Sequence, residues 1–503
     1  MSEFVPTPSQ KEAIETYGGT VLVSAGAGSG KTKVLTERLM RAVLDRDHPR
    51  DIDRFVVITF TNASAEELKS RITEELSHSE AALAAEEAVA PAFLDHVRRQ
   101  QALCQNAQIG TIHHFCVSLL REYGHLKGLP SDFKIVNDDL ALSMKEETLN
   151  RVLDEKYKTI QADPGFENLV NSVGVGRNDD RLAELVLSLY EKMQCHARPD
   201  RWAEDCVSAL KKDYADIGDT PWGQEILKSA CMEAEYWAEE LDRVMEAIAA
   251  DETVSKAYLD GISQGADGVR ELARCLRIGW NAARQCPPVT FGKLLPVKKE
   301  HAPALTEMVK KRRDACKKAL EKISSRLYAD SETISEELKR TAPAMEALLQ
   351  LTLSFEEAYA KEKRRNGFVD YADLEHFAAK LLTEEDGTST PLAKTVGDRY
   401  EEIMIDEYQD VSHVQEDIFQ AISNRGEKLF LVGDVKQAIY RFRLVDPEIF
   451  NQKYRDFPLK SLAQPGNPGK IILRENFRSR KEILAAANSI FSCCMSEQLG
   501  DVA

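Results

Sequence analysis

A glycine-rich stretch near the start of the chain has the residue types that bind phosphate groups. Residues 25–32 read Ala-Gly-Ala-Gly-Ser-Gly-Lys-Thr, between the apolar run Val21–Val23 and a helical pattern from Lys33 to Leu44. In such a strand–loop–helix unit, glycines let backbone N–H groups turn onto phosphates, and the helix N-terminus faces them. The pattern predicts a nucleoside triphosphate site, although its first position, usually glycine, is Ala25.

Within this loop, Lys31 is predicted to reach the β- and γ-phosphates and the Thr32 hydroxyl to bind Mg²⁺. A merely flexible turn is the alternative, and the flanking strand and helix disfavour it. The ATP-binding residues predicted in the loop are Ala25, Gly26, Ala27, Gly28, Ser29, Gly30, Lys31 and Thr32.

An acidic pair after another apolar run supplies the second half of such a site. Ile403–Ile405 is followed by Asp406-Glu407-Tyr408-Gln409-Asp410. Ligands bind beyond the carboxyl ends of parallel strands, so Asp406 is expected to hold Mg²⁺, directly or through water. Glu407 is expected to orient and deprotonate the attacking water. Alone, the two carboxylates could be an ordinary strand exit; with the upstream loop they favour ATP hydrolysis over phosphoryl transfer.

The composition is that of a globular protein of several domains. The 503 residues are 43% hydrophobic and 30% charged, with a net charge of −17. That charge disfavours electrostatic coating of nucleic acid but leaves room for a groove that binds a single strand by stacking. No secretory signal or bilayer-length apolar run is visible, and the ten cysteines form no C-x-x-C pair. These features predict a cytoplasmic protein with reduced thiols and no membrane contact.

Three zones differ in their patterning. Up to about residue 125, short apolar runs alternate with helical stretches, which is typical of a parallel sheet flanked by helices. From 126 to 365 strand patterns nearly vanish, and Ile226 to Ile248 carries an apolar stripe at helical spacing after Thr220-Pro221. From 366 onward the α/β pattern returns. The predicted strands are Val21–Val23, Phe55–Phe60, Ile109–Ile112, Ile403–Ile405, Leu429–Val432 and Ile471–Leu473.

Six segments, in order, resemble motifs of the superfamily 1 DNA helicases of the UvrD/Rep type. They are Ser24–Thr32, Thr59–Leu68, Gly110–Phe115, Asp406–Asp410, Gly433–Arg443 and Asn476–Ser479. The resemblance implies an α/β fold: a RecA-like P-loop NTPase core with a large all-helical insertion and the start of a second RecA-like core. The expected domains are 1–125 and 366–455 for the first core, 126–365 for the insertion and 456–503 for the second core.

The same resemblance assigns roles around ATP. Gln10 would read the adenine edge, a task suited to its amide, although a packing role remains open. Phe477 would stack on the adenine ring, and Gln437 would contact the γ-phosphate. Arg478 would act as an arginine finger on the charge of the transition state. The expected catalytic residues are Lys31, Glu407, Gln437 and Arg478.

For DNA, the resemblance implies a single strand that crosses the core domains and is held by stacking without reading sequence. Each ATP cycle would step the protein in the 3′ to 5′ direction. Phe442 replaces a Trp common in the family, so its contact should be weaker. The expected DNA-binding residues are Phe60, Asn62, His113, Tyr440, Phe442 and Arg443.

Within the family, the chain is most similar to the AddA/RecB-type helicase–nuclease subunits, with AddA the nearer. The long helical zone, the form of Thr61–Ala65 and the segment Phe368–Leu374 carry this likeness. It implies double-strand-break repair and recombination, single-stranded and forked DNA as substrates, and an AddB-like partner. A UvrD/Rep-type repair helicase fragment and a non-motor nucleotide-binding module remain alternatives.

The chain ends soon after Asn476–Ser479, and no segment resembles the family's fifth or sixth motif. The expectation is therefore a fragment that lacks most of the second core. Such a chain should bind nucleotide weakly, hydrolyse it slowly or not at all, and not unwind DNA alone.

Overall fold

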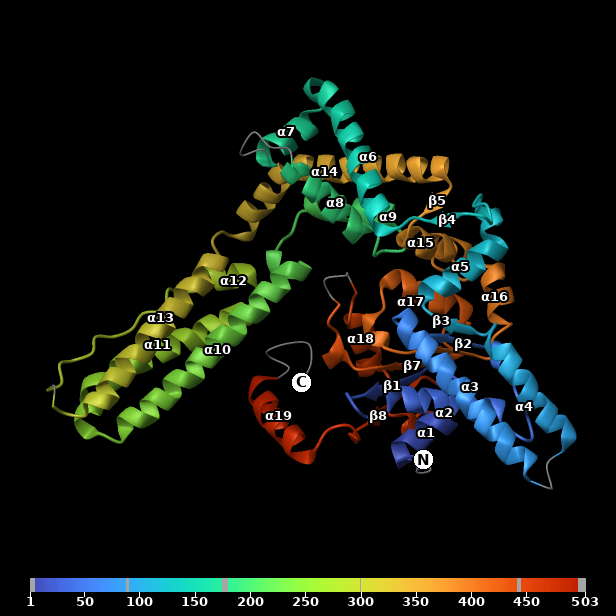
Figure 1. The fold of residues 1–503 in the computed structure, drawn as a ribbon. Coiled ribbons are helices and arrows are strands. Elements are labelled where there is room, and N and C mark those ends of the chain that lie inside the picture. The colour runs from blue at the N-terminus through green and yellow to red at the C-terminus, as the bar shows by residue number, and fades with distance from the viewer. Residues whose placement is uncertain (1–4, 87–89, 174–179, 299, 441–444, 496–503) are drawn as a thin grey trace. The chain divides into compact units, whose positions relative to one another are not determined.

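The computed structural model describes residues 5–86, 90–173, 180–298, 300–440 and 445–495. The described residues form two compact units (Figure 1). The first unit comprises Met1–Ile160, Gly176–Ala203 and Leu349–Ala503, and the second comprises Gln161–Val175 and Glu204–Leu348. These limits differ from the domains expected from sequence, because residues 126–160, 176–203 and 349–365 group with the sheet.

The first unit is built on a parallel sheet, which confirms the predicted fold class. Among the described residues it has six strands in the order β3-β2-β6-β7-β1-β8. Val57 lies opposite Met404, and Val23 lies between Val432 and Ile471. The strands are β1 Val21–Ala25, β2 Phe55–Ile58, β3 Gln108–Gly110, β6 Glu402–Ile405, β7 Leu429–Gly433 and β8 Gly469–Leu473.

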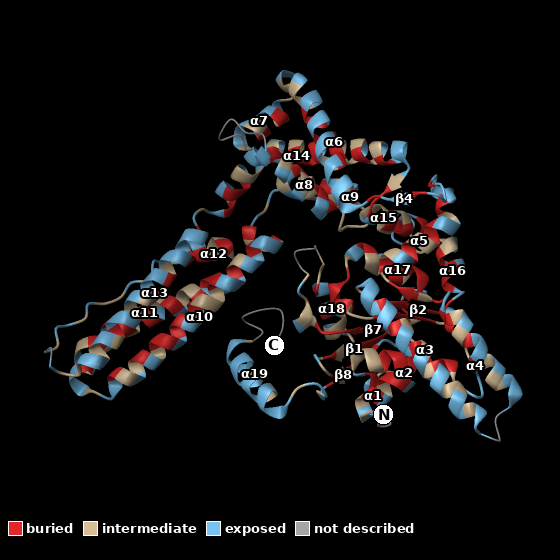
Figure 2. Ribbon diagram, in the orientation of Figure 1, coloured by how far each residue is buried: buried red, intermediate tan, exposed pale blue. Residues whose placement is uncertain are grey.

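Helices cover both faces of this sheet, so the strands are apolar on both sides. Successive strand residues alternate between two hydrophobic clusters; Leu22 faces one, and Val21 and Val23 face the other. Figure 2 shows the strands as buried. One cluster includes α1 Pro8–Glu15, α2 Lys31–Val43, α3 Asn62–Ala84 and α4 Pro91–Cys104. The other includes α5 Ile112–Tyr123, α15 Tyr371–Leu382, α16 Pro391–Gly397, α17 His413–Ile422 and α18 Glu448–Asp456.

Helix capping ends one predicted strand early. The apolar run Ile109–Ile112 was expected to be all strand, but Thr111 caps α5 by accepting a hydrogen bond from the His114 N–H. Ile112 is therefore the first residue of a helix, and its side chain is buried. A threonine followed by a helix-compatible run favours this N-cap over continued strand pairing.

The strand β8 belongs to the first sheet, although residues 456–503 were expected to begin a second core. It pairs in parallel with β1 from Val21–Gly469 to Ala25–Leu473. This pairing satisfies the backbone groups on the free edge of β1, and it buries Ile471 and Leu473. After β8, α19 (Lys481–Cys494) has no buried residue, and Figure 2 shows it as mainly exposed.

The helical part of the chain is divided between the two units. In the first unit, α6 (Asp138–Lys158) and α8 (Asp180–Met193) accompany a short parallel pair of strands, β4 (Lys134–Ile135) and β5 (Phe368–Val369). Two helices, α9 (Pro199–Lys211) and α14 (Ser331–Asn366), continue from one unit into the other.

The second unit has its own hydrophobic core. Thr220 caps α10 and Pro221 begins it, and the predicted apolar stripe of this helix is buried from Ala230 to Ile248. The core is independent of the sheet, so this unit is a helical domain in itself. Its helices are α7 Pro164–Val173, α10 Pro221–Ala249, α11 Glu252–Ile278, α12 Trp280–Gln285 and α13 Pro303–Arg326.

A buried ion pair joins the helix after the phosphate loop to a central strand. Arg38 of α2 is fully buried and contacts both carboxylate oxygens of Glu402 in β6, at 2.9 and 2.6 Å. It also donates to the Ala13 carbonyl oxygen at 2.7 Å and lies over the Phe430 ring. Removing one partner would leave a buried charge without compensation.

Arg38→Met is therefore expected to lower the free energy of unfolding by about 3–5 kcal/mol, measured by urea denaturation. Arg41→Met is the control on the same helix. Because the Arg41–Glu15 pair is largely exposed, its loss should cost less than about 1 kcal/mol. Equal effects of the two substitutions would show that the buried ion pair contributes no more to the free energy of unfolding than the exposed pair.

Candidate functional site

The predicted phosphate loop has a tight backbone turn that depends on its glycines. It connects β1 to α2, and Gly28 and Gly30 adopt positive φ angles of 75° and 84°. Ser29 closes the turn, because its N–H and its hydroxyl both donate to the Gly26 carbonyl oxygen, at 3.2 and 2.7 Å. Left-handed backbone favours glycine, which explains the residue type at both positions.

Gln10 lies against this loop with its amide already bonded to the protein. Its Nε2 donates to the Ser29 carbonyl oxygen at 3.0 Å, and its Oε1 accepts from the Thr7 N–H at 2.9 Å. The side chain is 2% exposed. In this arrangement Gln10 braces the loop, so a contact with adenine would require an exchange of partners and stays a prediction.

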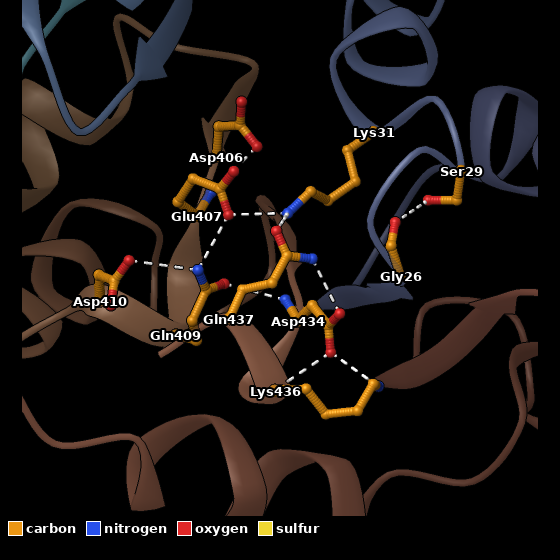
Figure 3. A network of polar contacts seen from close by, with 10 residues as sticks. All are labelled: Gly26, Ser29, Lys31, Asp406, Glu407, Gln409, Asp410, Asp434, Lys436 and Gln437. Carbon is orange, nitrogen blue, oxygen red and sulfur yellow. Dashed lines mark hydrogen bonds and ion pairs between the residues drawn. The ribbon is translucent and has the colours of Figure 1, made fainter. Parts of the chain in front are cut away.

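Lys31 joins the phosphate loop to the ends of two other strands (Figure 3). Its Nζ lies 2.8 Å from Glu407 Oε2, after β6, and 3.3 Å from Gln437 Oε1, after β7. Along the chain, Lys31 is 376 positions from Glu407 and 406 positions from Gln437. The structure thus brings together three of the four catalytic residues predicted from sequence.

Asp406 and Glu407 are held in contrasting environments. Burial and, second, the adjacent charge of Glu407 raise the pKa of Asp406 to about 6. Glu407 has a left-handed backbone conformation with φ of 52°, which is unusual for a residue other than glycine and costs energy. The strained turn aims two consecutive carboxylates at different points, with the half-buried Asp406 beside the strand and Glu407 toward Lys31.

Gln409 and Asp434 lie at the centre of a hydrogen-bond network that the sequence analysis did not identify. The Gln409 Nε2 donates to Glu407 Oε2 at 2.9 Å, and its Oε1 accepts from the Asp434 N–H at 2.9 Å. Asp434 in turn accepts from Gln437 Nε2 at 2.8 Å and from Lys436. Gln409 and Asp434 both lie within the motif segments named above, so the sequence did contain them. Which residues they contact depends on the directions of their side chains, which the sequence does not give.

Thr32 and Asp406 are the two residues predicted to hold a magnesium ion. Among the residues that the structure describes, no group of three or more His, Cys, Asp or Glu side chains could hold a metal ion. Mg²⁺ usually keeps several waters and takes one or two carboxylates plus substrate phosphates, so a full protein cage is not required. The half-buried Asp406 carboxyl, whose pKa is raised, and the Thr32 hydroxyl at the end of the phosphate loop match that preference.

The segment after β8 lies directly on the phosphate loop. Asn476 Nδ2 donates to the Ala27 carbonyl oxygen at 2.6 Å, and the Phe477 N–H donates to the Gly28 carbonyl oxygen at 2.8 Å. A Cβ on Gly28 would lie 2.8 Å from Arg478 Cβ. The predicted stacking residue and arginine finger therefore border the phosphate loop, and the Phe477 ring is 63% exposed.

Several predicted DNA-binding residues follow the carboxyl ends of the strands. The Phe60 ring, after β2, stacks on the Tyr440 ring, after β7, with centroids 4.5 Å apart. Asn62 is exposed at the start of α3, and His113 is in the first turn of α5. Phe442 and Arg443 lie outside the residues that the structure describes. Sequence reasoning did not identify Tyr371, whose ring contacts the His113 ring, or Glu375, whose carboxylate contacts the His113 imidazole.

No helix of the described residues combines the length and the apolar character needed to cross a membrane.

Comparison with known proteins identifies the family. Residues 6–458 match the model of the UvrD/REP helicase N-terminal domain.

Similar proteins include the A subunits of several ATP-dependent helicase/nucleases. That of Bacillus cytotoxicus is 34% identical over 99% of this chain, and that of Ruminiclostridium cellulolyticum is 32% identical over all of it. That of Acetivibrio thermocellus is 35% identical over 99% of the chain. The chain spans 40% of the length of each of these relatives. The chain belongs to the UvrD/REP helicase family.

Proposed function

We propose that this chain is the ATP-binding and ATP-hydrolysing portion of a DNA helicase that translocates 3′ to 5′ on single-stranded DNA. The observation that carries the proposal is the contact of Lys31 with both Glu407 and Gln437 at the ends of neighbouring strands. Both side chains lie within hydrogen-bond distance of the Lys31 ammonium, which supports roles for Lys31 as the phosphate-binding cation, Glu407 as the general base and Gln437 as the γ-phosphate sensor.

The hydrolytic step would use an exchange of partners at Lys31. Bound ATP would supply the phosphoanhydride to be broken, and Mg²⁺, held by Thr32 and Asp406, would supply positive charge that offsets the charge developing on the phosphates. Lys31 would turn from Glu407 to the phosphates, which frees the Glu407 carboxylate to orient a water and take its proton. Gln409 would keep Glu407 in place, since its Nε2 donates to the same carboxylate oxygen.

Gln437 offers a short route from the nucleotide to the DNA. Its Oε1 accepts from Lys31 and its Nε2 donates to Asp434. Three residues later, Tyr440 stacks on Phe60. A movement of Gln437 toward a γ-phosphate would therefore be transmitted to the aromatic pair. Stacking on aromatic rings holds any base, which suits a motor that passes over every sequence.

Arg478 and Phe477 would complete the nucleotide site from the segment after β8. Arg478 would place a positive charge near the transferred phosphoryl group, and Phe477 would stack on adenine. Their backbone is already held on the phosphate loop by Asn476 and by the Phe477 N–H. Gln10 would exchange one of its backbone contacts for the adenine edge.

The wider role is proposed from the relatives. Their name describes the A subunit of a helicase/nuclease, which is one component of a larger assembly. We infer an AddB-like partner, action on single-stranded and forked DNA, and a place in double-strand-break repair and recombination. A cytoplasmic location is proposed as well, because the ten cysteines are free thiols.

ATP hydrolysis by the purified chain, with and without single-stranded DNA, tests the motor proposal. We expect slow turnover that DNA stimulates and that Glu407→Gln lowers by at least about a hundredfold, because a general base contributes on that order. Nucleotide binding should survive in this variant, whereas Lys31→Ala should abolish it. No strand separation by this chain alone is expected.

Two results would contradict the proposal. Turnover that persists in Glu407→Gln would remove the assigned base. Retained ATP and DNA binding with no turnover at all would favour the alternative, a nucleotide-binding module without productive hydrolysis.

The partly desolvated charge of Asp406 should lower the stability of the folded protein when no Mg²⁺ is bound. Its pKa is raised to about 6 when folded, above the ordinary value of 3.8, so the folded state holds the proton more tightly. Stability from this group is greatest below about pH 4 and falls as pH rises to about 6.

Asp406→Asn is therefore expected to raise the free energy of unfolding at pH 7.5, without nucleotide, by about 1–3 kcal/mol, while Mg²⁺-dependent ATP binding falls. The two proteins should converge near pH 4. Asp132→Asn, at an exposed position, is the control and should change neither quantity. A destabilised Asp406→Asn variant at neutral pH would contradict the sign of the effect.

A further inference from the structure

The second unit contains a cluster of cations that the proposed function does not use. It lies where α13 passes the segment 286–298, which follows α12. The cluster surrounds a hollow with a volume of about 470 Å³, within the range of roughly 300–1,000 Å³ that is typical of ligand pockets. The residues that line the hollow are Lys293, Leu294, Lys310, Arg313 and Asp314.

The segment 286–298 is held against α11, so one wall of the hollow is fixed. The Gly292 N–H donates to the Gly261 carbonyl oxygen at 3.1 Å, and Figure 1 shows the segment running beside these helices. The Phe291 ring lies against Gly265 of α11, where a Cβ would overlap the ring. Only a glycine permits so close an approach, which explains the residue type at this position.

Arg313 is oriented by the same segment. Its Nη2 donates to the Gly292 carbonyl oxygen at 3.1 Å, and its guanidinium carbon lies 5.6 Å from the centre of the Phe291 ring. Its Nε is buried and has no hydrogen-bond partner among the described residues. A guanidinium has several N–H donors, so this pre-oriented group keeps others for a ligand.

The cations of the hollow lack carboxylate partners, unlike a neighbour on the same helix. Lys311, which does not line the hollow, contacts Glu307 at 2.9 Å. In the part of the chain that the structure describes, Lys293, Lys310 and Arg313 form no ion pair. Three unpaired cations in one hollow, in a chain with a net charge of −17, attract an anionic ligand.

The lining favours a carboxylate-rich peptide over the phosphate backbone of a nucleic acid. It includes Leu294, and the adjacent Leu295 is 56% exposed. A phosphate backbone gains nothing from leucine surface, whereas an apolar side chain of a peptide removes that surface from water. Asp314 repels a continuous line of phosphates, but separate carboxylates can lie on either side of it.

We propose that this hollow binds an acidic segment of a partner protein, in which carboxylates flank an apolar side chain. The carboxylates contact Lys293, Lys310 and Arg313, and the apolar side chain packs on Leu294 and Leu295. The binding site lies within the second unit, so it does not depend on the proposed ATPase.

The test measures binding of a fluorescein-labelled peptide, Asp-Asp-Leu-Asp-Asp-Leu, to the full chain by anisotropy, without nucleotide. Lys293→Gln together with Lys310→Gln should raise Kd about tenfold, because each charge pair at a partly exposed site is worth a few-fold in affinity. Asp314→Asn should lower Kd about twofold, since it removes a repulsive charge. Lys311→Gln is the control, and it should leave Kd within about twofold of the wild type because Lys311 contacts Glu307 instead.

The peptide itself supplies a second control. Serine in place of both leucines should raise Kd about tenfold, because the apolar contact with Leu294 and Leu295 is lost. Added salt should weaken binding of the original peptide, since charge pairs at the surface are screened. Circular dichroism establishes that each variant is folded, and all the substituted side chains are exposed.

Three results would overturn the inference. The first is no binding of the peptide by the wild type, or the same Kd for the double variant as for Lys311→Gln. The second is equal binding of the leucine and serine peptides, which would indicate only a general attraction of charge. The third is a short DNA duplex whose Kd rises more than that of the peptide in the double variant, which would assign the hollow to phosphates.

Discussion

The ammonium group of Lys31 connects the glycine-rich loop after β1 to the strand ends of β6 and β7, through Glu407 and Gln437. Such contacts are possible only because the strands run parallel and end at one edge of the sheet. The same constraint places the expected DNA contacts of the first unit. Phe60, His113 and Tyr440 follow β2, β3 and β7 at that edge, so the nucleotide and the proposed DNA path share one surface.

Charge at both ends of β6 is stabilised by contacts between residues distant in the chain. Arg38 and Glu402 neutralise each other at the amino end of this strand, and Lys31 contacts Glu407 just beyond its carboxyl end. Asp406 and Asp410 nonetheless have pKa values raised to about 6, mainly by burial. A cation would relieve this cost, as the proposed Mg²⁺ would, which is a physical reason for the site to favour a loaded state.

The backbone around Glu407 shows the same exchange of stability for function. A left-handed glutamate is costly, and it persists because Gln409, Lys31 and the following 3₁₀ turn hold it. By contrast, the first turn of α15 is unstrained and well supported, because it begins with a complete capping box at Asp370 that contacts the buried Lys363. Backbone strain is therefore found at the chemical centre, whereas the expected DNA contacts Asn62 and His113 lie in the first turns of capped helices.

Local sequence patterns determined much of this protein. They predicted the strands, the phosphate loop, the acidic segment, the α10 stripe and the family, since apolar alternation, glycine spacing and short motifs act within about thirty residues. They did not place β8 in the first sheet, because nothing local says which strand edge is free. Nor did they find Gln409, Asp434 or Tyr371 as partners. Those pairings join residues distant in the chain, and only the packed sheet decides which side chains meet.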